Sequence, residues 1–266
     1  MTFSFYPQAN TLQNVTARTK AARERSLASS KSDVVGNRVV MEEYLYLNLP
    51  EQDKSLAVQI DTALLFVTAG FETTAFTIEQ AVFHLHDQPT LLSKLHEELV
   101  IAIPDSHLIP PWSELEKLPY LSAIIQESLR MSLGAMSRLP RTNTKHDLHY
   151  KSWTIPKNTY VGMSAQFTNY NADIFPDPYT FVPERWLQSV DESKRLGRYM
   201  VSFSKGSRKC IGIHLAYAEL YITLATIFRR FRFELYETTR RDVDPKIDYF
   251  APKPEHGSLG VRLLVR

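Results

Sequence analysis

The sequence has little cysteine and little net charge. Cys210 is the one cysteine among 266 residues, so no disulfide can form within the chain, although this says little about the redox compartment. The 31 basic and 29 acidic residues leave a net charge of +2. This bulk charge gives no reason to expect a nucleic-acid partner.

Long apolar runs and internal repeats are also lacking. The longest apolar stretch, ALLFVTAGF, is far shorter than the ~20 residues that a membrane-spanning helix needs. The first residues, MTFSFYPQAN, lack the basic segment followed by an apolar run that marks a signal peptide. We therefore expect no membrane span in this chain, and a cytoplasmic or peripheral location for the chain as written.

The residues that are present are those of a soluble globular protein, with 44% apolar and 23% charged residues. Residues 1–52 are weakly patterned. Within them, ARTKAARERSLASSKS predicts a solvated helix followed by a loop, with a nucleic-acid or membrane contact as the alternative. Residues 53–266 are patterned more strongly, so we divide the chain into an N-terminal segment (1–52) and a core (53–266).

Apolar residues at three- and four-residue steps predict long helices. In the first of these, Leu56, Ile60, Leu64 and Val67 follow the helical period, and apolar residues on nearly every side predict a course through the core. The predicted helices cover residues 55–86, 89–103, 119–133 and 213–231.

The segments between and after these helices have a different texture. LHYKSWTIPKNTYVGMS carries β-branched and aromatic residues interrupted by Pro156 and Asn158, which predicts short strands and turns. FRFELYE and LGVRLLVR predict closing strands, and a loop is predicted from Asp191 to Tyr199. The pattern therefore favours a mainly α fold with a minor β component.

The cysteine lies in FSKGSRKCIG, residues 203–212, ahead of the last long helix. A lone cysteine is most often a small core residue, but here the helix dipole and the cations of Arg208 and Lys209 favour a thiolate. Gly206 and Gly212 let the backbone turn tightly and approach a flat or bulky group. One thiolate without Cys or His partners makes no zinc site, whereas haem iron needs only one such axial ligand.

This cysteine segment resembles the haem-binding loop of the cytochrome P450 family, Phe-x-x-Gly-x-Arg-x-Cys-x-Gly, at all five fixed positions. The resemblance implies that Cys210 is the proximal ligand of the iron of haem b (iron protoporphyrin IX). It also implies that Arg208 pairs with a haem propionate and that Phe203 packs by the sulfur. Gly206 and Gly212 complete the motif.

The stretch AGFETT in the first long helix is similar to the oxygen-binding segment of the same family. A glycine inside a helix costs roughly 1 kcal/mol relative to alanine, and close helix packing is the alternative explanation for Gly70. By resemblance, Gly70 leaves room over the iron, Thr73 hydrogen-bonds dioxygen or its water, and Glu72 relays protons. Phe66 and Ala69 would face the substrate.

Two further segments, ESLR and PERW, resemble the family's structural network. Glu127 and Arg130 are three residues apart on one helix face, a pair that stabilises an exposed helix by only ~0.2–0.5 kcal/mol. The resemblance adds Arg185 and implies that the three are buried together, locking the cysteine loop to the helix. Removing one member of such a network costs ~3–5 kcal/mol.

The segment GAMSRLPR after this helix is similar to the one in which family members place an arginine against a haem propionate. Arg141 fits if one residue of slack is allowed. Arg138 is the competitor, with a surface loop position as its alternative. The same alignment places Ala135 and Met136 on the substrate side.

The four motifs follow one another in the family's order, and the resemblance covers about Asp61 to Arg266. It implies the C-terminal, haem-ligating portion of the P450 fold with the N-terminal portion absent, because the chain has about half the family's length. The chain looks most like members from filamentous fungi that act in secondary metabolism. Asn169, Tyr170 and Asn171 depart from the family's His-Arg-Asp-like run, which we interpret as tolerated variation.

The activity that the resemblance implies is that of a haem-thiolate monooxygenase, which inserts one oxygen atom from dioxygen into a small apolar substrate. Electrons would come from NADPH through a reductase that docks near Lys205 and Lys209. A full-length form with the family's N-terminal anchor would lie at the endoplasmic-reticulum membrane.

Two other interpretations are open. The chain could be a truncated, catalytically incompetent fragment that acts as a non-enzymatic or unstable module. It could also be a generic helical protein whose cysteine is buried and structural.

Overall fold

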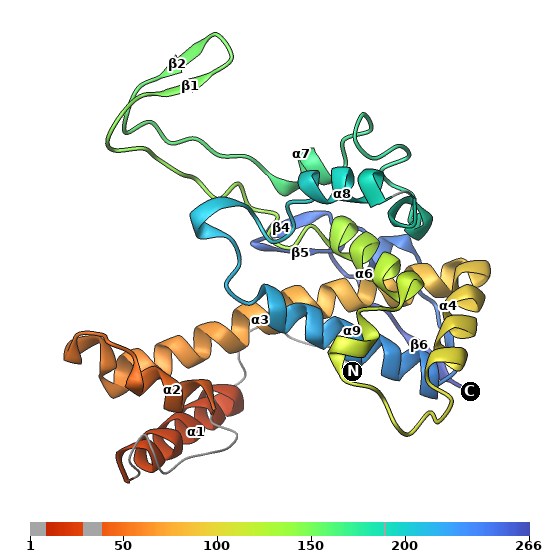
Figure 1. Ribbon diagram of the computed structural model, residues 1–266, viewed down its shortest axis with the longest axis horizontal. Helices are drawn as coiled ribbons and strands as arrows, with labels where there is room; N and C mark the ends of the chain where they lie inside the picture. The colour runs from red at the N-terminus through yellow and green to blue at the C-terminus, as the bar shows by residue number, and fades with distance from the viewer. Residues whose placement is uncertain (1–8, 29–38, 189) are drawn as a thin grey trace. The chain divides into compact units, whose positions relative to one another are not determined.

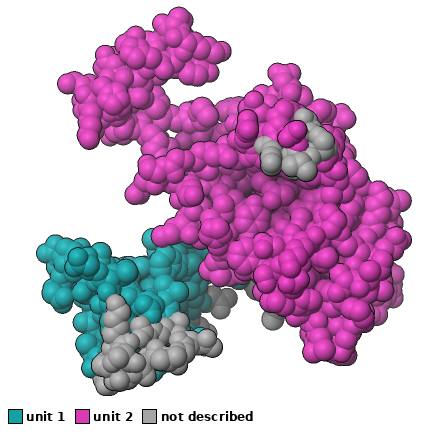
Figure 2. All heavy atoms as spheres, in the orientation of Figure 1, with its two compact units in different colours: residues 1–72 teal, residues 73–266 magenta. Residues whose placement is uncertain are grey.

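The computed structural model describes residues 9–28, 39–188 and 190–266. The chain forms two compact units, residues 1–72 and residues 73–266 (Figure 2). The division between them falls within helix α3, Leu56–Asp87. Our division after residue 52 rests on the sequence pattern and remains a prediction.

The described part of the first unit is helical. It contains α1 (Ala9–Ala28), α2 (Val40–Tyr46), a 3-10 helix (Glu51–Lys54) and the first turns of α3. The solvated helix predicted from residue 17 onward is the second half of α1. The loop predicted after it begins outside the described residues.

Polar contacts hold α1 to the segments that follow it. Arg25 Nε donates to Glu42 Oε1 at 2.7 Å, and Arg23 Nη1 donates to the carbonyl oxygen of Lys54 at 2.6 Å. These contacts fasten α1, whose sequence is weakly patterned, to the following segments of the first unit.

The second unit is built mainly from helices, with the end of α3 among them (Figure 1). Its α-helices after α3 are α4 (Pro89–Ala102), α5 (Trp112–Leu115), α6 (Pro119–Ser132), α7 (Ala165–Asn169), α8 (Val190–Tyr199) and α9 (Ile213–Arg230). Its 3-10 helices are Pro183–Trp186, Gly206–Arg208 and Arg240–Asp242.

The core of the second unit lies where α4, α6 and α9 meet the end of α3. The apolar residues that recur at helical steps are fully buried there, among them Leu85, Leu95, Leu99, Ile124 and Leu224. Proline opens both α4 and α6, where the missing N–H is not needed and its fixed φ suits the first helical turn. The predicted helices are thus confirmed to within about two residues at their ends.

Three antiparallel two-stranded sheets complete the described part of this unit. Their strands are β1 (Leu148–Tyr150) with β2 (Trp153–Ile155), β3 (Phe233–Leu235) with β6 (Leu263–Val265), and β4 (Ile247–Tyr249) with β5 (Ala251–Lys253). The two predicted closing strands are therefore confirmed and pair with each other. The mainly helical fold with small sheets agrees with the predicted fold class.

The loop predicted from Asp191 to Tyr199 is wrong, because this segment is helix α8. Its charged residues outnumber the apolar ones, so the helical period was not recognised from the sequence. Leu196, which is 3% exposed, fixes the helix by packing in a small cluster with Phe175 and Trp186.

The predicted course of α3 through the core is correct only for its C-terminal turns. Phe83 and Leu85 are buried, whereas Leu65, Phe66 and Phe71 are 64%, 40% and 54% exposed. An all-round apolar pattern does not show which part of a helix its own unit buries.

Among the described residues, one helix is long and apolar enough to cross a membrane by length and composition alone. It is α3, whose most apolar 18-residue window has a mean hydropathy of 1.2 and is 11% buried. Our prediction of no span rested on the short uninterrupted run and did not consider this longer window. The C-terminal turns of α3 pack in the core of the second unit, and core helices of folded domains pass the same test.

Candidate functional site

The cysteine loop, residues 203–212, is closed by short backbone hydrogen bonds. Cys210 N donates to the carbonyl oxygen of Phe203 at 2.9 Å, and Lys209 N donates to that of Gly206 at 3.2 Å. Ser204 and Gly206 have φ of 60° and 78°, the left-handed region that favours glycine and makes the tight turn possible. The loop therefore presents Cys210 on a compact backbone ring.

The Cys210 thiol is exposed, which contradicts a buried structural cysteine. Helix α9 begins at Ile213, and Gly212 accepts the first hydrogen bond, from Ala216 N at 2.9 Å. The sulfur therefore lies just ahead of the positive end of the helix dipole, as predicted. Phe203 behind the loop stacks at a tilt on Tyr217 of α9, with ring centroids 5.4 Å apart, and packs against the main core.

Glu127 is the centre of a buried charge network, which we call the Glu127 network and which comprises Glu127, Arg130, Arg185 and Trp186. Arg130 donates to both Glu127 oxygens, Nε at 2.9 Å and Nη2 at 2.8 Å. Arg185 Nε and Trp186 Nε1 donate to them at 3.1 Å and 2.9 Å. The Glu127 and Arg130 side chains are 0% exposed and that of Arg185 7%.

Arg130 also ties α6 to the chain that leads toward the cysteine loop. Its Nη1 donates to the carbonyl oxygens of Asn169 and Pro178, and its Nη2 donates to that of Thr180. The Arg130 guanidinium thus pairs bidentately with Glu127 and also donates to three backbone carbonyl oxygens. The contacts within the predicted trio are present, whereas its functional importance remains a prediction.

Asn169 connects this network to the cysteine loop, a role that sequence reasoning missed. Its side chain is fully buried, and Nδ2 donates to Arg130 O at 3.1 Å and to Ser202 Oγ at 2.9 Å. Its Oδ1 accepts from Val201 N at 3.2 Å. We had interpreted this asparagine as tolerated variation, but it bonds the backbone directly before Phe203.

Gly134 brings the end of α6 against the same backbone. Its φ is 67°, and an added Cβ would lie 2.2 Å from the carbonyl oxygen of Ser202. Only glycine fits this close approach. The glycine directly follows the left-handed C-cap of α6, Leu133, and this helix-end signal could have been found in the sequence.

Two buried titratable side chains border the Glu127 network. His84 of α3 stacks on Phe181, with ring centroids 4.8 Å apart and planes at 9°. Burial, reinforced by the charges of Arg240 and Arg130, lowers the pKa of His84 to about 3. Burial likewise raises the pKa of the Tyr170 hydroxyl, which donates to the backbone of α6. Both groups are therefore neutral at pH 7.

The residues of the AGFETT stretch lie on α3, and the division between the two units falls between Glu72 and Thr73. Thr73 is half-buried, and its carbonyl oxygen accepts from Thr77 Oγ1, which in turn pairs with Ser132 Oγ of α6 at 2.9 Å. An added Cβ at Gly70 would meet no heavy atom within 4 Å. Close packing therefore does not explain this glycine.

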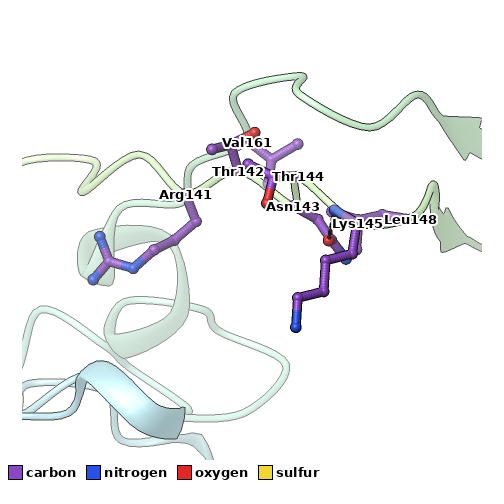
Figure 3. A pocket seen from close by; sticks show the side chains of 7 residues that line it. All are labelled: Arg141, Thr142, Asn143, Thr144, Lys145, Leu148 and Val161. Carbon is purple, nitrogen blue, oxygen red and sulfur yellow. Dashed lines mark hydrogen bonds between the residues drawn. The ribbon is translucent and has the colours of Figure 1, made fainter.

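The remaining predicted site residues follow α6. Ala135 and Met136 are half-buried, and Met136 N donates to Phe250 O at 2.8 Å. Arg141 and Arg138 are exposed, and Arg141 pairs through its backbone with Val161. In Figure 3 the Arg141 guanidinium extends away from the other side chains that line a surface hollow of ≈ 350 Å³.

The structure thus brings some predicted residues together. The Glu127 network is assembled, and it is linked through Asn169 and Ser202 to the loop that holds Cys210. The predicted partners of a haem propionate, Arg208 and Arg141, are both exposed.

Comparison with known proteins decides the family. The family model described as "Cytochrome P450" matches residues 6–260. The chain belongs to the cytochrome P450 family.

Its relatives include fungal P450 monooxygenases. The chain is 43% identical over 238 residues to cytochrome P450 monooxygenase MO6277 of Ascocoryne sarcoides, which covers 89% of this chain and 46% of that protein. It is 42% identical to monooxygenase claJ of Penicillium crustosum, over 82% of this chain and 50% of that protein. It is 39% identical to conidiogenone synthase PchP450 of Penicillium rubens, over 82% and 43%. The chain thus spans about half the length of the curated relatives it matches.

The family implies a haem group, and the donor chemistry of the cysteine loop fits it. The thiol is accessible, and a thiolate suits iron as a soft axial ligand. Ile211, the next residue, and Leu215 in the first turn of α9 are 87% and 61% exposed, apolar side chains of the kind that pack on a flat macrocycle. Arg208 supplies an exposed guanidinium of the kind that binds carboxylates.

Proposed function

We propose that the chain carries the haem-ligating portion of a P450 monooxygenase and that Cys210 is its axial ligand. The haem would supply the activation of dioxygen, through which one oxygen atom enters a small apolar substrate. The observation that carries this proposal is the exposed thiol on a loop that a buried network attaches to α6.

Each of the chain's own residues has a distinct part in this proposal. Cys210 would hold the iron, and Arg208 and Arg141 would bind the propionates. Thr73 would hydrogen-bond dioxygen or its water, and Glu72 would relay protons to it. The Glu127 network positions the loop and touches no reacting atom.

The proposal also names the residues that would face the substrate. By resemblance to the family, the residues that would face the substrate are Phe66, Ala69 and Gly70 of the first unit and Ala135 and Met136 of the second. All are small or apolar, which suits an apolar substrate.

Electrons would come from NADPH through a reductase that docks on the face of the cysteine loop. Lys205 and Lys209 are exposed there and would steer an acidic partner. The proteins that this chain resembles are fungal P450 proteins, and we propose that this chain too acts in fungal secondary metabolism.

A haem-binding experiment tests the proposal. The purified chain is mixed with haemin, reduced, and exposed to carbon monoxide. Thiolate ligation predicts a strongly red-shifted Soret band, and Cys210→Ser should abolish it. Ser207→Ala, which changes an exposed side chain of the same loop, is the matched control and should keep it. The same red-shifted band in Cys210→Ser would overturn the assignment of the ligand.

The second candidate is a fragment that keeps the motifs without binding haem. The exposed cysteine loop and the exposed apolar side chains of α3 favour it, because both surfaces lack a covering layer among the described residues. A chain that is folded by circular dichroism yet stays colourless with haemin would support this candidate and contradict the first.

A further inference from the structure

A hollow at the surface of the second unit lies where the end of α3, the start of α4, the end of α9 and strand β3 meet. Helices α4 and α9 pack together beside it (Figure 1). Its volume is ≈ 300 Å³, at the small end of the range for ligand pockets. None of its residues has a part in the proposed function. The side chains that shape it are those of His86, Leu92, His96, Phe231, Arg232 and Phe233.

Aromatic rings line this hollow. The centroid of the His86 ring lies 5.8 Å from that of Phe228 and 6.3 Å from that of Phe233. The rings of Phe231 and Phe233 are also 5.8 Å apart. Phe228 is 3% exposed and belongs to the main core, whereas Phe231 is 47% exposed. The rings therefore extend from the core to solvent, and their faces and edges suit packing against a planar ligand.

Arg232 gives the hollow a positive charge. Its Nη1 donates to the carbonyl oxygens of Phe228 at 3.5 Å and Phe231 at 3.1 Å, and its Nη2 donates to His96 Nε2. Burial, reinforced by the charges of Arg232 and Arg229, lowers the pKa of His96. His96 is therefore a neutral acceptor, and all these partners leave the charge of Arg232 uncompensated.

The acidic side chains on the same elements are engaged elsewhere. Glu97 of α4 accepts from Ser93 Oγ at 3.2 Å, and Glu234 of β3 pairs with Arg266. Within the part of the chain that the structure describes, no carboxylate pairs with Arg232. Because a guanidinium binds a carboxylate through two parallel hydrogen bonds, the charge in the hollow complements an anionic ligand of this kind.

We propose that this hollow binds a planar aromatic carboxylate with one or two fused rings. The ligand's rings pack on Phe231 and Phe233, and Arg232 donates to its carboxylate. An uncharged aromatic molecule would leave Arg232 without a counter-charge, and an aliphatic acid would lose the contacts between rings. The small volume of the hollow limits the ligand to one or two rings. This binding does not depend on haem.

Isothermal titration calorimetry of the full chain with 2-naphthoate tests this proposal. The chain should bind 2-naphthoate more tightly than 2-naphthylmethanol, which has the same rings without the charge, and more tightly than cyclohexanecarboxylate, which has the charge without the rings. Arg232→Gln should weaken the binding of 2-naphthoate about tenfold, because it removes charge-assisted hydrogen bonds. It should leave the binding of 2-naphthylmethanol unchanged, which shows that the hollow is still folded.

Arg230→Gln is the matched control. Arg230 donates to the carbonyl oxygens of Ser106 and His107 and does not line the hollow, so the affinity for 2-naphthoate should not change. Equal affinities for 2-naphthoate in Arg232→Gln and in the unchanged chain would overturn the proposal, as would the absence of binding by the unchanged chain. Loss of binding in Cys210→Ser would assign the ligand to the proposed haem site and equally overturn it.

Discussion

The Glu127 network and the cysteine loop are neighbours in the second unit, yet the network is buried within the fold whereas most of the loop is exposed. Glu127 and Arg130 are 0% exposed, and the Glu127 carboxylate accepts hydrogen bonds from α6 and from the segment around Arg185. In the cysteine loop, by contrast, every side chain from Lys205 to Ile211 is exposed.

The difference indicates where a ligand is needed. A buried network whose charges are paired is held by the fold without any further group. Phe203 anchors the loop on the core, but from Lys205 to Ile211 the loop is exposed and closed mainly by its own backbone, so we expect a bound partner to make it more rigid. Asn169 and Ser202 join the two, which lets the rigid region position the start of the loop.

The strongest test of the comparison is Glu127→Gln, which removes the charge that Arg130 and Arg185 share. Two buried guanidinium groups would lose their counter-charge, and we expect a loss of ~3–5 kcal/mol in the free energy of unfolding. Urea unfolding followed by circular dichroism measures it.

The matched control for that variant is Glu114→Gln. Glu114 of α5 and Lys117 in the turn after it are also three residues apart but are more than half exposed, so the loss should be below ~1 kcal/mol. Equal losses in both variants would contradict the special role of the buried network.

The second test is Gly134→Ala, which acts where the network region meets the cysteine loop. The added Cβ would lie 2.2 Å from Ser202 O, and separating the two backbones should cost ~1–3 kcal/mol beyond the strain of a positive φ. Gly257→Ala has a similar φ, 81°, and open space, so it measures the strain alone. Equal losses in the two variants, measured by urea unfolding, would show that the contact with Ser202 does not matter.

The Glu127 network was largely predictable from sequence, whereas its link to the cysteine loop was not. Glu127 and Arg130 are one helical turn apart, so their contact follows from the helix itself. Asn169 and Ser202 are 33 residues apart and meet only through the tertiary fold. A local pattern contains no signal for such a contact.

The third test concerns His84, a buried histidine beside the Glu127 network that stays uncharged in the folded state. The folded state holds His84 neutral, with its pKa lowered to about 3 by burial, whereas the unfolded chain binds a proton below its ordinary value of 6.5. Stability from this group is thus present above pH 6.5 and is lost as the pH falls toward 3. The loss should approach ~1.4 kcal/mol per pH unit within this window.

Replacement by a ring that cannot titrate isolates this effect. His84→Phe keeps the stacking on Phe181, so its unfolding free energy should fall less steeply between pH 6.5 and pH 4 than that of the unchanged chain. Parallel pH profiles for the two proteins would contradict a neutral His84 in the folded state.

The smallest stability effect is expected in the cysteine loop. Arg208 is exposed, so Arg208→Ala should change the free energy of unfolding by less than ~0.5 kcal/mol. The same variant should weaken haemin binding, measured by spectroscopic titration, because it removes a propionate partner. A large loss of stability with unchanged haemin affinity would assign Arg208 a structural role instead.

Two segments of the fold were not predicted correctly from the sequence: the charge-rich helix α8 and the exposed part of the apolar helix α3. Helix α8 was missed because the buried Leu196 lies in a segment dominated by charged residues. The exposed side chains of α3, such as Phe71, were expected in the core because an apolar pattern reports what a residue prefers, not what covers it.

Hydrogen exchange of the chain with and without haemin tests the central claim most directly. The account predicts that the amides of α6 around Glu127 are protected in both states, whereas those of Phe203 to Gly212 become protected only with haemin. Cys210→Ser should remove the gain in the loop and leave α6 unchanged. Protection of the loop without haemin, or loss of protection in α6 without it, would contradict the account.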